Sequence, residues 1–383
     1  MQPLSILFVF RAPLGGLFRQ VVDLVTHQSA AGHRIGIVCD SLTGGARAVE
    51  VLRGLEAACV LGIHRMPMHR NPHPSDIANI RAIARIAREA GADVLHGHGS
   101  KGGLYARFDA IAGLHGPVRA YTPHGGSFNY RPGTAIHRAY MVVEKLLERG
   151  TDVFTFESRY IAGCFSREVG ATDKLVRIAL NGLYDHEFAP RALAPDATDL
   201  VFMGELRAAK GIDLLIEALG RLKTRGSTPS ITIVGSGPDE AMLKAMAARH
   251  GIADQATFPG PMRGPEGLAR GRIMVVPSRI ESLPYIILEA VAAEVPLVTT
   301  DCGGVNEIVG TDYPWMISSH SVEALETGIA AAIAASPAQC AAQARVLRDR
   351  ARPIFDVVKM SEDVVAAYRA AIAARRPEQR KAA

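Results

Sequence analysis

Short runs of β-branched and apolar residues alternate with longer segments of helical periodicity along the whole chain. This alternation is typical of parallel β-sheets that carry helices on both faces. In the first half, the predicted strands are Ile6–Phe10, Ile35–Cys39, Val94–His96, Ala120–Thr122, Val153–Phe156 and Val176–Ala179. In the second half, they are Leu200–Met203, Ile231–Val234, Ala256–Phe258, Ile273–Pro277 and Leu297–Thr300. The sequence therefore predicts an α/β protein with two sheets.

A segment that contains two prolines, residues 188–198, separates the two sets of strands. Its apolar residues follow neither the helical nor the strand periodicity, as expected of an interdomain linker. The 383 residues are enough for about two or three domains that each bury a core. We predict an N-terminal domain over residues 1–188, a C-terminal domain over 198–355 and a final helix over 356–375.

The five cysteines are scattered and never form a CxxC pair, which excludes a disulfide framework and a zinc knuckle and favours a reducing compartment. The apolar run Ile6–Phe10 has no basic residue before it, so it indicates a strand rather than a signal peptide. No run approaches the ~18 apolar residues of a membrane span. We expect a cytoplasmic protein that is at most peripheral, at the inner face of the cell membrane.

Positive charge is concentrated in the first half of the chain. Residues 1–190 hold 21 Lys and Arg against 16 Asp and Glu, whereas the remainder holds 22 of each. This excess makes the first half the better candidate for contact with an anionic partner such as a phosphate or a membrane surface, although a modest net charge of this kind is more often plain surface chemistry. Nucleic acid is not an expected partner, because no recognition motif accompanies the charge.

Glycines and histidines follow several predicted strands of the first half. Gly15 and Gly16 lie where a strand turns into a helix, a place that suits an anion, although close packing explains such a pair as well. His96, His98 and His124 lie at strand ends, where α/β sheets bind ligands. A single strand-end histidine is usually structural, but three in two adjacent loops favour a site.

A second strand-to-helix turn, Gly204 to Asp213, carries Arg207 and Lys210, two cations three residues apart. The rigid guanidinium of Arg207 and the mobile ammonium of Lys210 are together suited to binding the oxygens of a diphosphate. The alternative is a solvated helix start with a salt bridge to Asp213.

The segment from Gly235 to Glu240 resembles a dinucleotide fingerprint that lacks its third glycine. Glu240 occupies the position where close packing of helix on strand needs a glycine, which disfavours a nicotinamide or flavin site. An NAD-dependent dehydrogenase is therefore an unfavoured interpretation.

Two carboxylates, Glu281 and Glu289, surround a predicted helix start at Pro284. A carboxylate that accepts two hydroxyl groups suits a ribose or a sugar, and the free amides of the helix start favour a phosphate. For either acid alone, a helix cap or a surface position is a sufficient explanation. The pair Gly303 and Gly304 then repeats the arrangement of strand, glycines and helix.

Taken in order, these motifs resemble the retaining glycosyltransferases of the GT-B fold, in particular the large family four. The resemblance runs from about residue 6 to 310 and rests on the Gly15-Gly16 turn, His124-Gly125, the Gly204 turn, the E-x7-E pair and Gly303-Gly304-Val-x-Glu307. It implies two Rossmann-like domains facing each other across a cleft. The N-terminal domain would bind the acceptor, the C-terminal domain would bind a nucleotide-sugar donor, and the last helix would cross back onto the first domain.

The resemblance also implies roles for individual residues. Arg207 and Lys210 would hold the donor diphosphate, Glu289 the ribose hydroxyls, Glu281 the transferred sugar, and His124 would contact that sugar. Many members have Arg where this chain has Glu205, so Arg207 is the substitute. Further donor-binding positions are Gly15, Gly16, Gly204, Gly235, Pro261, Met262, Ser282, Leu283, Pro284, Gly303 and Gly304. The acceptor-binding candidates are His96, His98, Lys101 and Arg19.

No Asp-x-Asp occurs in the chain, so the usual carboxylate cage for a metal under the diphosphate is missing and we expect a metal-independent transfer without a cofactor. The family resemblance implies retention of the anomeric configuration. Segments around His96 and Thr122 look like those of members that build bacterial surface polysaccharides on lipid diphosphate carriers. UDP is favoured over GDP as the donor nucleotide, and peripheral contact with an anionic membrane agrees with the basic N-terminal half.

Two alternatives stay open. A nucleotide-sugar 2-epimerase shares the architecture and needs no acceptor, but the E-x7-E pair beside Arg207 and Lys210 favours transfer. A non-catalytic nucleotide-sugar-binding protein would be favoured by the loss of Glu281, Glu289 or Lys210, and all three are present.

Overall fold

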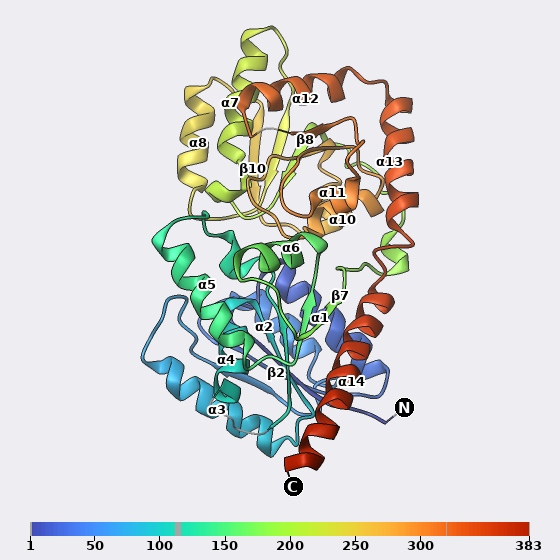
Figure 1. The fold of residues 1–383 in the computed structure, drawn as a ribbon. Coiled ribbons are helices and arrows are strands. Elements are labelled where there is room, and N and C mark those ends of the chain that lie inside the picture. Colours follow the sequence, from blue (N-terminus) through green and yellow to red (C-terminus); the bar gives the residue numbers. More distant parts are fainter. Residues whose placement is uncertain (1, 112–115, 319, 383) are drawn as a thin grey trace. The chain divides into compact units, whose positions relative to one another are not determined.

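The computed structural model describes residues 2–111, 116–318 and 320–382, with side chains described as far as Arg375. It divides into two compact units (Figure 1). Unit 1 comprises Met1–Gly182 and Val357–Ala383, and unit 2 comprises Leu183–Asp356. Each unit contains one sheet in which every pairing between named strands is parallel.

The sheet of unit 1 has the order β3-β2-β1-β4-β5-β6-β7. Its strands are β1 (Ser5–Phe10), β2 (Arg34–Asp40), β3 (Ile63–Met66), β4 (Val94–His98), β5 (Val118–Thr122), β6 (Val153–Phe156) and β7 (Leu175–Ile178). All six residues of β1 are buried. Because helices cover both faces of a parallel sheet, an interior strand such as β1 must be apolar on both sides, which explains its unbroken apolar run in the sequence.

Helices cover both faces of this sheet. They are α1 (Gly15–Ala30), α2 (Gly45–Gly54), α3 (Ser75–Glu89), α4 (Gly99–Ile111), α5 (Ala135–Glu148), α6 (Arg159–Glu168) and α14 (Val357–Ala382), with a short 3-10 helix, η1 (Gly126–Asn129). α1 packs against α14, whereas α3 packs against α4. The core between α3, α4 and the sheet includes Val9, Ile83, Leu95 and Tyr105.

Unit 2 has the sheet order β10-β9-β8-β11-β12-β13. Its strands are β8 (Thr198–Met203), β9 (Ile231–Val234), β10 (Ala256–Gly260), β11 (Gly271–Val276), β12 (Leu297–Thr300) and β13 (Met316–Ile317). Its helices are α7 (Ile212–Thr224), α8 (Glu240–Arg249), α9 (Gly264–Leu268), α10 (Tyr285–Ala292), α11 (Val305–Val309), α12 (Val322–Ala334) and α13 (Pro337–Ala351), with 3-10 turns η2 (Asp185–Glu187) and η3 (Ala208–Lys210). This order is that of a Rossmann sheet.

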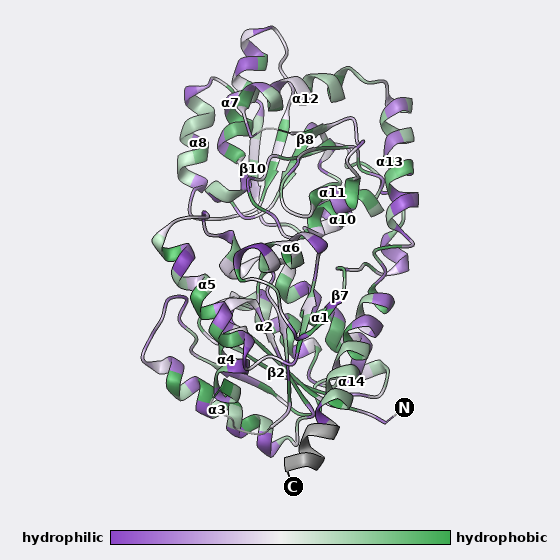
Figure 2. Cartoon of the chain, in the orientation of Figure 1, coloured by the Kyte–Doolittle hydropathy of each residue, from purple (hydrophilic) through white to green (hydrophobic). Residues whose placement is uncertain are grey.

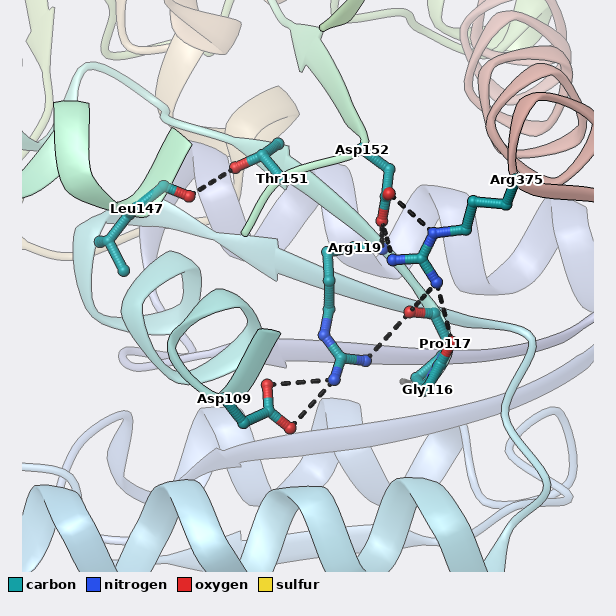
Figure 3. A network of polar contacts seen from close by, with 8 residues as sticks. All are labelled: Asp109, Gly116, Pro117, Arg119, Leu147, Thr151, Asp152 and Arg375. Atoms are coloured by element: carbon teal, nitrogen blue, oxygen red, sulfur yellow. Dashed lines mark hydrogen bonds and ion pairs between the residues drawn. The ribbon is translucent and has the colours of Figure 1, made fainter. Parts of the chain in front are cut away.

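The last helix, α14, belongs to unit 1 although the whole of unit 2 precedes it. It packs against β5, β6, β7 and α1. Its residue Arg375 forms a bidentate pair with Asp152, in which Nη2 donates to Oδ2 at 2.5 Å. Arg375 donates from Nε to Asp152 Oδ1 (2.7 Å) and from Nη1 to the carbonyl oxygens of Gly116 and Pro117 (2.8 and 3.0 Å), as Figure 3 shows. Helix α14 therefore covers the part of the sheet that β5, β6 and β7 form.

The observed boundaries differ from those predicted from the sequence. The units divide between residues 182 and 183 rather than at 188, because Leu183 donates its N–H to Phe355 and Arg191 donates to Gly271, which ties the proline-rich segment to unit 2. The predicted strands omit the edge strands β3 and β13, one of which is four half-buried residues and the other only two residues long. Within the described part of the chain, no helix combines the length and the apolarity needed to cross a bilayer.

Candidate active site

Both sheets have a point at which the strand order reverses, and ligands of open α/β sheets bind beyond the carboxyl ends of the strands there. In unit 1 this point lies between β1 and β4, and in unit 2 it lies between β8 and β11. The loop after β8 carries Arg207 and Lys210, and the loop after β11 carries Glu281. The topology of unit 2 therefore brings the predicted phosphate-binding and sugar-binding residues together.

An ion pair joins these two loops. Lys210 Nζ donates to Glu281 Oε1 at 2.6 Å, and the Oγ atom of Ser278 donates to the same oxygen at 2.7 Å. The side chains of Lys210 and Glu281 are 18% and 9% exposed, respectively. The ammonium and the carboxylate thus stand together at the switch point with little solvent around them, where their charges act strongly on a bound group.

A glycine permits the approach of the two loops. Gly211, directly after Lys210, has φ +67°, and a Cβ atom there would lie 1.9 Å from the carbonyl oxygen of Pro277. No side chain fits that space, and the left-handed backbone conformation favours glycine. Lys210 therefore reaches Glu281 because the turn that carries it lies directly on the end of β11.

Asp213, which the alternative interpretation of this turn made a salt-bridge partner within it, pairs with Arg279. The guanidinium of Arg279 donates to both carboxylate oxygens at 2.7 and 2.6 Å. Desolvation by burial opposes ionisation of Asp213, but the hydrogen bonds and the charge of Arg279 outweigh it and lower the pKa of this carboxyl. Arg207 pairs with Glu205 at 2.7 Å, and both side chains are exposed. Arg207 thus lies on the predicted turn but points to its own loop, and Arg279 is a structural cation that sequence reasoning did not single out.

The second acid of the E-x7-E pair, Glu289, lies on α10 and is partly buried. A Cβ atom at Gly264 would lie 2.9 Å from Glu289 Oε2, so this carboxylate lies against the start of α9. The loop between β10 and α9 holds Pro261 and Met262, two of the predicted donor-binding positions. The structure therefore places Glu289 beside that loop, while Glu281 lies with Lys210. Pro284, expected at the first helical position, is the N-cap residue of α10 instead.

The glycine pair before α11 approaches the Glu281 loop very closely. A Cβ atom at Gly303 would lie 1.7 Å from the carbonyl oxygen of Glu281, and one at Gly304 would lie 2.2 Å from that of Ser282. The N–H of Gly304 donates to the same Ser282 oxygen at 2.8 Å. These two glycines are thus needed to hold the loop that carries Glu281, and Leu283, buried beside them, anchors it.

Two further glycines shape the Gly204 turn. A Cβ atom at Gly235, after β9, would lie 1.9 Å from the carbonyl oxygen of Gly204. The N–H of Gly204 donates to Val234 and that of Gly235 donates to Gly260. Gly235 therefore supports the turn through its backbone, and the fingerprint-like glycine pattern has a packing explanation.

In unit 1, the Gly15-Gly16 turn begins α1 and is exposed, with no atom within 4 Å of a Cβ atom at Gly15. The other polar candidates are engaged with neighbours. Arg19 donates to Asp23 at 2.7 Å, and Lys101 donates to Asp76 at 2.6 Å and to the carbonyl oxygen of Asn71 at 3.0 Å. Lys101 is therefore a largely buried cation with structural partners, and its place in an acceptor site stays a prediction.

The rings of the three strand-end histidines lie next to one another, His96 beside His98 and His98 beside His124. His96 is fully buried; its Nδ1 atom lies 2.6 Å from Tyr368 Oη and its Nε2 atom 2.9 Å from Thr122 Oγ1. Desolvation lowers the pKa of this ring well below 6.5, so it is neutral. Helix α14 covers the ring through Tyr368, 272 residues further along the chain, so the His96 ring is not exposed to a ligand in this structure. Its role in acceptor binding stays a prediction.

His98 is also fully buried, and its Nδ1 atom lies 2.9 Å from His124 Nε2. His124 is only partly buried and has φ +54°, a conformation that side chains other than glycine rarely adopt. Desolvation lowers its pKa to about 3. His124 is thus a neutral ring held by His98, and it can exchange hydrogen bonds with a ligand without carrying charge.

A buried acid fixes the loop that follows His124. Glu144 on α5 accepts from Arg107 Nη2 at 2.9 Å and from Ser127 Oγ at 2.8 Å, and Ser127 in turn lies 2.8 Å from Ser100 Oγ. Arg107 is completely buried, and Glu144 is 2% exposed. The sequence does not single out this pair, because both helices carry further charged residues.

The described residues contain no group of three or more His, Cys, Asp or Glu side chains placed to hold a metal ion. Cys302 lies in the loop before Gly303, and burial raises the pKa of its thiol to about 12. This cysteine is therefore an apolar packing residue rather than a nucleophile.

Comparison with known proteins agrees with this geometry. The model of "Glycosyltransferase Family 4" matches residues 14–185, and that of "Glycosyl transferases group 1" matches residues 185–347. A protein of Bacillus subtilis named as glycosyltransferase EpsD is 30% identical over 64% of this chain and 68% of its own. A protein of Escherichia coli named as the colanic acid biosynthesis glycosyltransferase WcaL is 25% identical over 74% of this chain and 73% of its own.

The fold has solved counterparts as well. The structure of Anabaena Alr3699/HepE in complex with UDP-glucose superposes with a TM-score of 0.76 at 17% identity, covering 95% of this chain and 98% of that one. Two Rossmann-like units of this topology define the GT-B glycosyltransferases, which confirms the predicted fold class. With both halves matched by family models, the chain belongs to glycosyltransferase family four and is a glycosyltransferase.

Proposed function

We propose that this enzyme transfers a sugar from a nucleotide-diphosphate sugar, with UDP favoured over GDP, to a glycan acceptor during polysaccharide biosynthesis. The Lys210–Glu281 pair at the switch point of unit 2 carries this proposal. It combines a cation for the diphosphate with a carboxylate for sugar hydroxyls in one poorly solvated place. The names of WcaL and of the UDP-glucose complex of HepE support the reaction class and the nucleotide.

In this proposal, Lys210 neutralises the charge that grows on the departing nucleotide. Arg207 joins it by leaving its exposed pair with Glu205, and the amides near Gly303, Gly304 and the start of α10 assist. Charge fixed in place before the reaction stabilises such a leaving group without reorganisation. The transfer would then need no metal ion.

Glu281 binds hydroxyls of the transferred sugar, and Glu289 binds the two ribose hydroxyls, since a carboxylate can accept from two neighbouring hydroxyl groups. The base would lie against the loop of Pro261 and Met262, beside Glu289. The different surroundings of the two acids support these separate roles, because Glu281 lies against Lys210 and Glu289 lies against Gly264.

We propose retention of the anomeric configuration through displacement on one face of the sugar. The bond from the anomeric carbon to the phosphate oxygen breaks, the acceptor oxygen bonds to that carbon, and the acceptor proton passes to the leaving phosphate. The family resemblance implies that His124, a neutral ring, contacts the sugar and that Gly15 and Gly16 approach the donor. No protein nucleophile is required.

The acceptor is proposed to be linked to a lipid diphosphate carrier at the inner face of the cell membrane. The basic excess of the first half of the chain supports an anionic acceptor side. With Lys101 and Arg19 engaged in ion pairs, this charge would act through the exposed cations of unit 1 rather than through those two residues.

A panel of UDP-sugars and GDP-sugars, each with and without EDTA, tests the donor, the metal and the reaction class together. Thermal shift would report binding, and slow hydrolysis of the donor would report chemistry. We expect one UDP-sugar to stabilise the protein and to be hydrolysed equally fast in EDTA. Stabilisation by none of the donors, or hydrolysis abolished by EDTA, would show that Lys210 and Glu281 have been misinterpreted.

A further inference from the structure

Helix α5 of unit 1 carries an unusual amount of apolar surface. Ile136, Val142, Val143 and Leu146 are 50%, 60%, 42% and 46% exposed, respectively. The side of α5 that packs on the unit holds His137, Met141, Glu144, Leu147 and Glu148 instead. The four aliphatic side chains are therefore not part of the core, and their exposure in water has a cost unless another surface covers them.

Cations accompany these aliphatic residues, two of them on α5 and the third, Arg149, at its C-cap. Arg138, Lys145 and Arg149 are exposed and follow one another at intervals of seven and four residues, so they form a stripe along α5. Among the described residues, Arg138 and Arg149 have no ion-pair partner, whereas Lys145 pairs with the largely buried Glu148. The two acids of α5 are both buried, so its outer face carries positive charge only. Figure 2 shows hydrophobic and hydrophilic residues alternating along α5.

The neighbouring helix extends the apolar surface. Phe108 and Ile111, at the end of α4, are 51% and 38% exposed. A Cβ atom at Gly150, just after α5, would lie 3.2 Å from Ile111 Cγ1, so the end of α4 lies beside the end of α5. We call the six apolar residues and the three cations the α4–α5 face.

We propose that the α4–α5 face docks the enzyme on an anionic membrane surface. A helix that presents exposed aliphatic side chains beside Lys and Arg, with no exposed acid, matches the interface of a bilayer, where acyl chains lie beneath negatively charged headgroups. A protein partner would need acidic and apolar surface in the same arrangement, and vesicle binding distinguishes the two. The inference deepens the proposed function, because it rests on an acceptor that is held at a membrane.

Vesicle flotation tests the proposal with the full-length protein. The probes are vesicles of phosphatidylcholine with and without phosphatidylglycerol, each at low and high salt. We expect binding to the anionic vesicles that weakens as salt is added, because each cation near the surface contributes about fivefold in affinity and is screened within a Debye length.

The variant Val142→Ser/Val143→Ser/Leu146→Ser removes aliphatic surface without touching the packed side of α5, and we expect at least about a tenfold loss of vesicle affinity. The matched control is Val346→Ser with Arg249→Gln in unit 2, where the valine is 62% exposed and the arginine lies on the surface of α8. This control should bind vesicles like the wild type. Arg138→Gln/Arg149→Gln should lower the salt dependence.

Absence of wild-type binding to anionic vesicles would overturn the proposal, and so would equal binding by the triple variant. A wild-type dimer in solution that the triple variant dissociates would overturn it in favour of a contact between two copies. Stabilisation by the donor sugar should be unchanged in the triple variant. The two proposals can therefore fail separately. If no donor sugar stabilises the protein but vesicle binding persists and depends on α5, the proposed function is rejected and the membrane-docking proposal is retained.

Discussion

Replacing Lys210 by alanine separates the electrostatic role of this residue from its structural one. The pair with Glu281 is 2.6 Å long and poorly exposed. At an effective dielectric constant of about 20, two unit charges at this separation attract by about 6 kcal/mol, before the cost of removing them from water. Measured losses lie near 0–1 kcal/mol for exposed pairs and about 3–5 kcal/mol for buried ones.

Because the two side chains lie between these limits, we expect Lys210→Ala to lower the free energy of unfolding by about 2–3 kcal/mol. Glu281 keeps its hydrogen bond from Ser278, so the variant should fold at moderate temperature. Turnover should fall further than stability explains, by about 10²–10³, because one preorganised charge at the leaving group is lost.

The assay measures urea unfolding and donor turnover on the same samples. Lys244→Ala is the matched control in unit 2, since Lys244 pairs with Glu240 on the surface of α8 at 2.7 Å. That change should alter stability by less than about 0.5 kcal/mol and leave turnover intact. A folded Lys210→Ala enzyme with turnover within about tenfold of the wild type would refute the electrostatic role and leave Lys210 as a structural partner of Glu281.

Two further predictions follow from backbone geometry and from burial. Gly303→Ala should lower both turnover and stability by more than Gly251→Ala. Both glycines have positive φ, but a Cβ atom at Gly303 would lie 1.7 Å from the carbonyl oxygen of Glu281, whereas one at Gly251 would meet open space. Equal effects of the two substitutions on thermal unfolding and turnover would contradict this reasoning. The free energy of unfolding should fall as the pH drops below about 6.5. The reason is that histidines of the unfolded chain take up protons there, whereas burial keeps the pKa values of His96, His98 and His124 low in the folded protein. Measured by urea unfolding, this fall in the free energy of unfolding should be smaller for His124→Asn. A wild-type protein that becomes more stable between about pH 6.5 and 5 would contradict this prediction.

The sequence alone determined the two parallel sheets and the positions of the loops that matter. Strands such as Ile6–Phe10 are apolar throughout because both faces are covered, and this pattern is visible in a single chain. The carboxyl ends of parallel strands meet at one edge, so the order of strands and loops along the chain is enough to assign Gly204 to Lys210 and Glu281 to one region. Edge strands with polar residues, such as Ile63–Met66, lack that pattern and were missed.

Only the tertiary structure decided which charged groups pair and which are buried. Lys210 pairs with Glu281, while Asp213 takes Arg279, and nothing in the local sequence distinguishes these choices. His96 is covered by Tyr368, a residue of α14 that returns to unit 1 after the whole of unit 2. Ion pairing and burial depend on contacts between segments that are far apart in the chain, whereas strand and turn patterns depend on neighbours. For this reason the candidate residues could be placed on their loops from the sequence, whereas their hydrogen-bond and ion-pair partners could be assigned only from the fold.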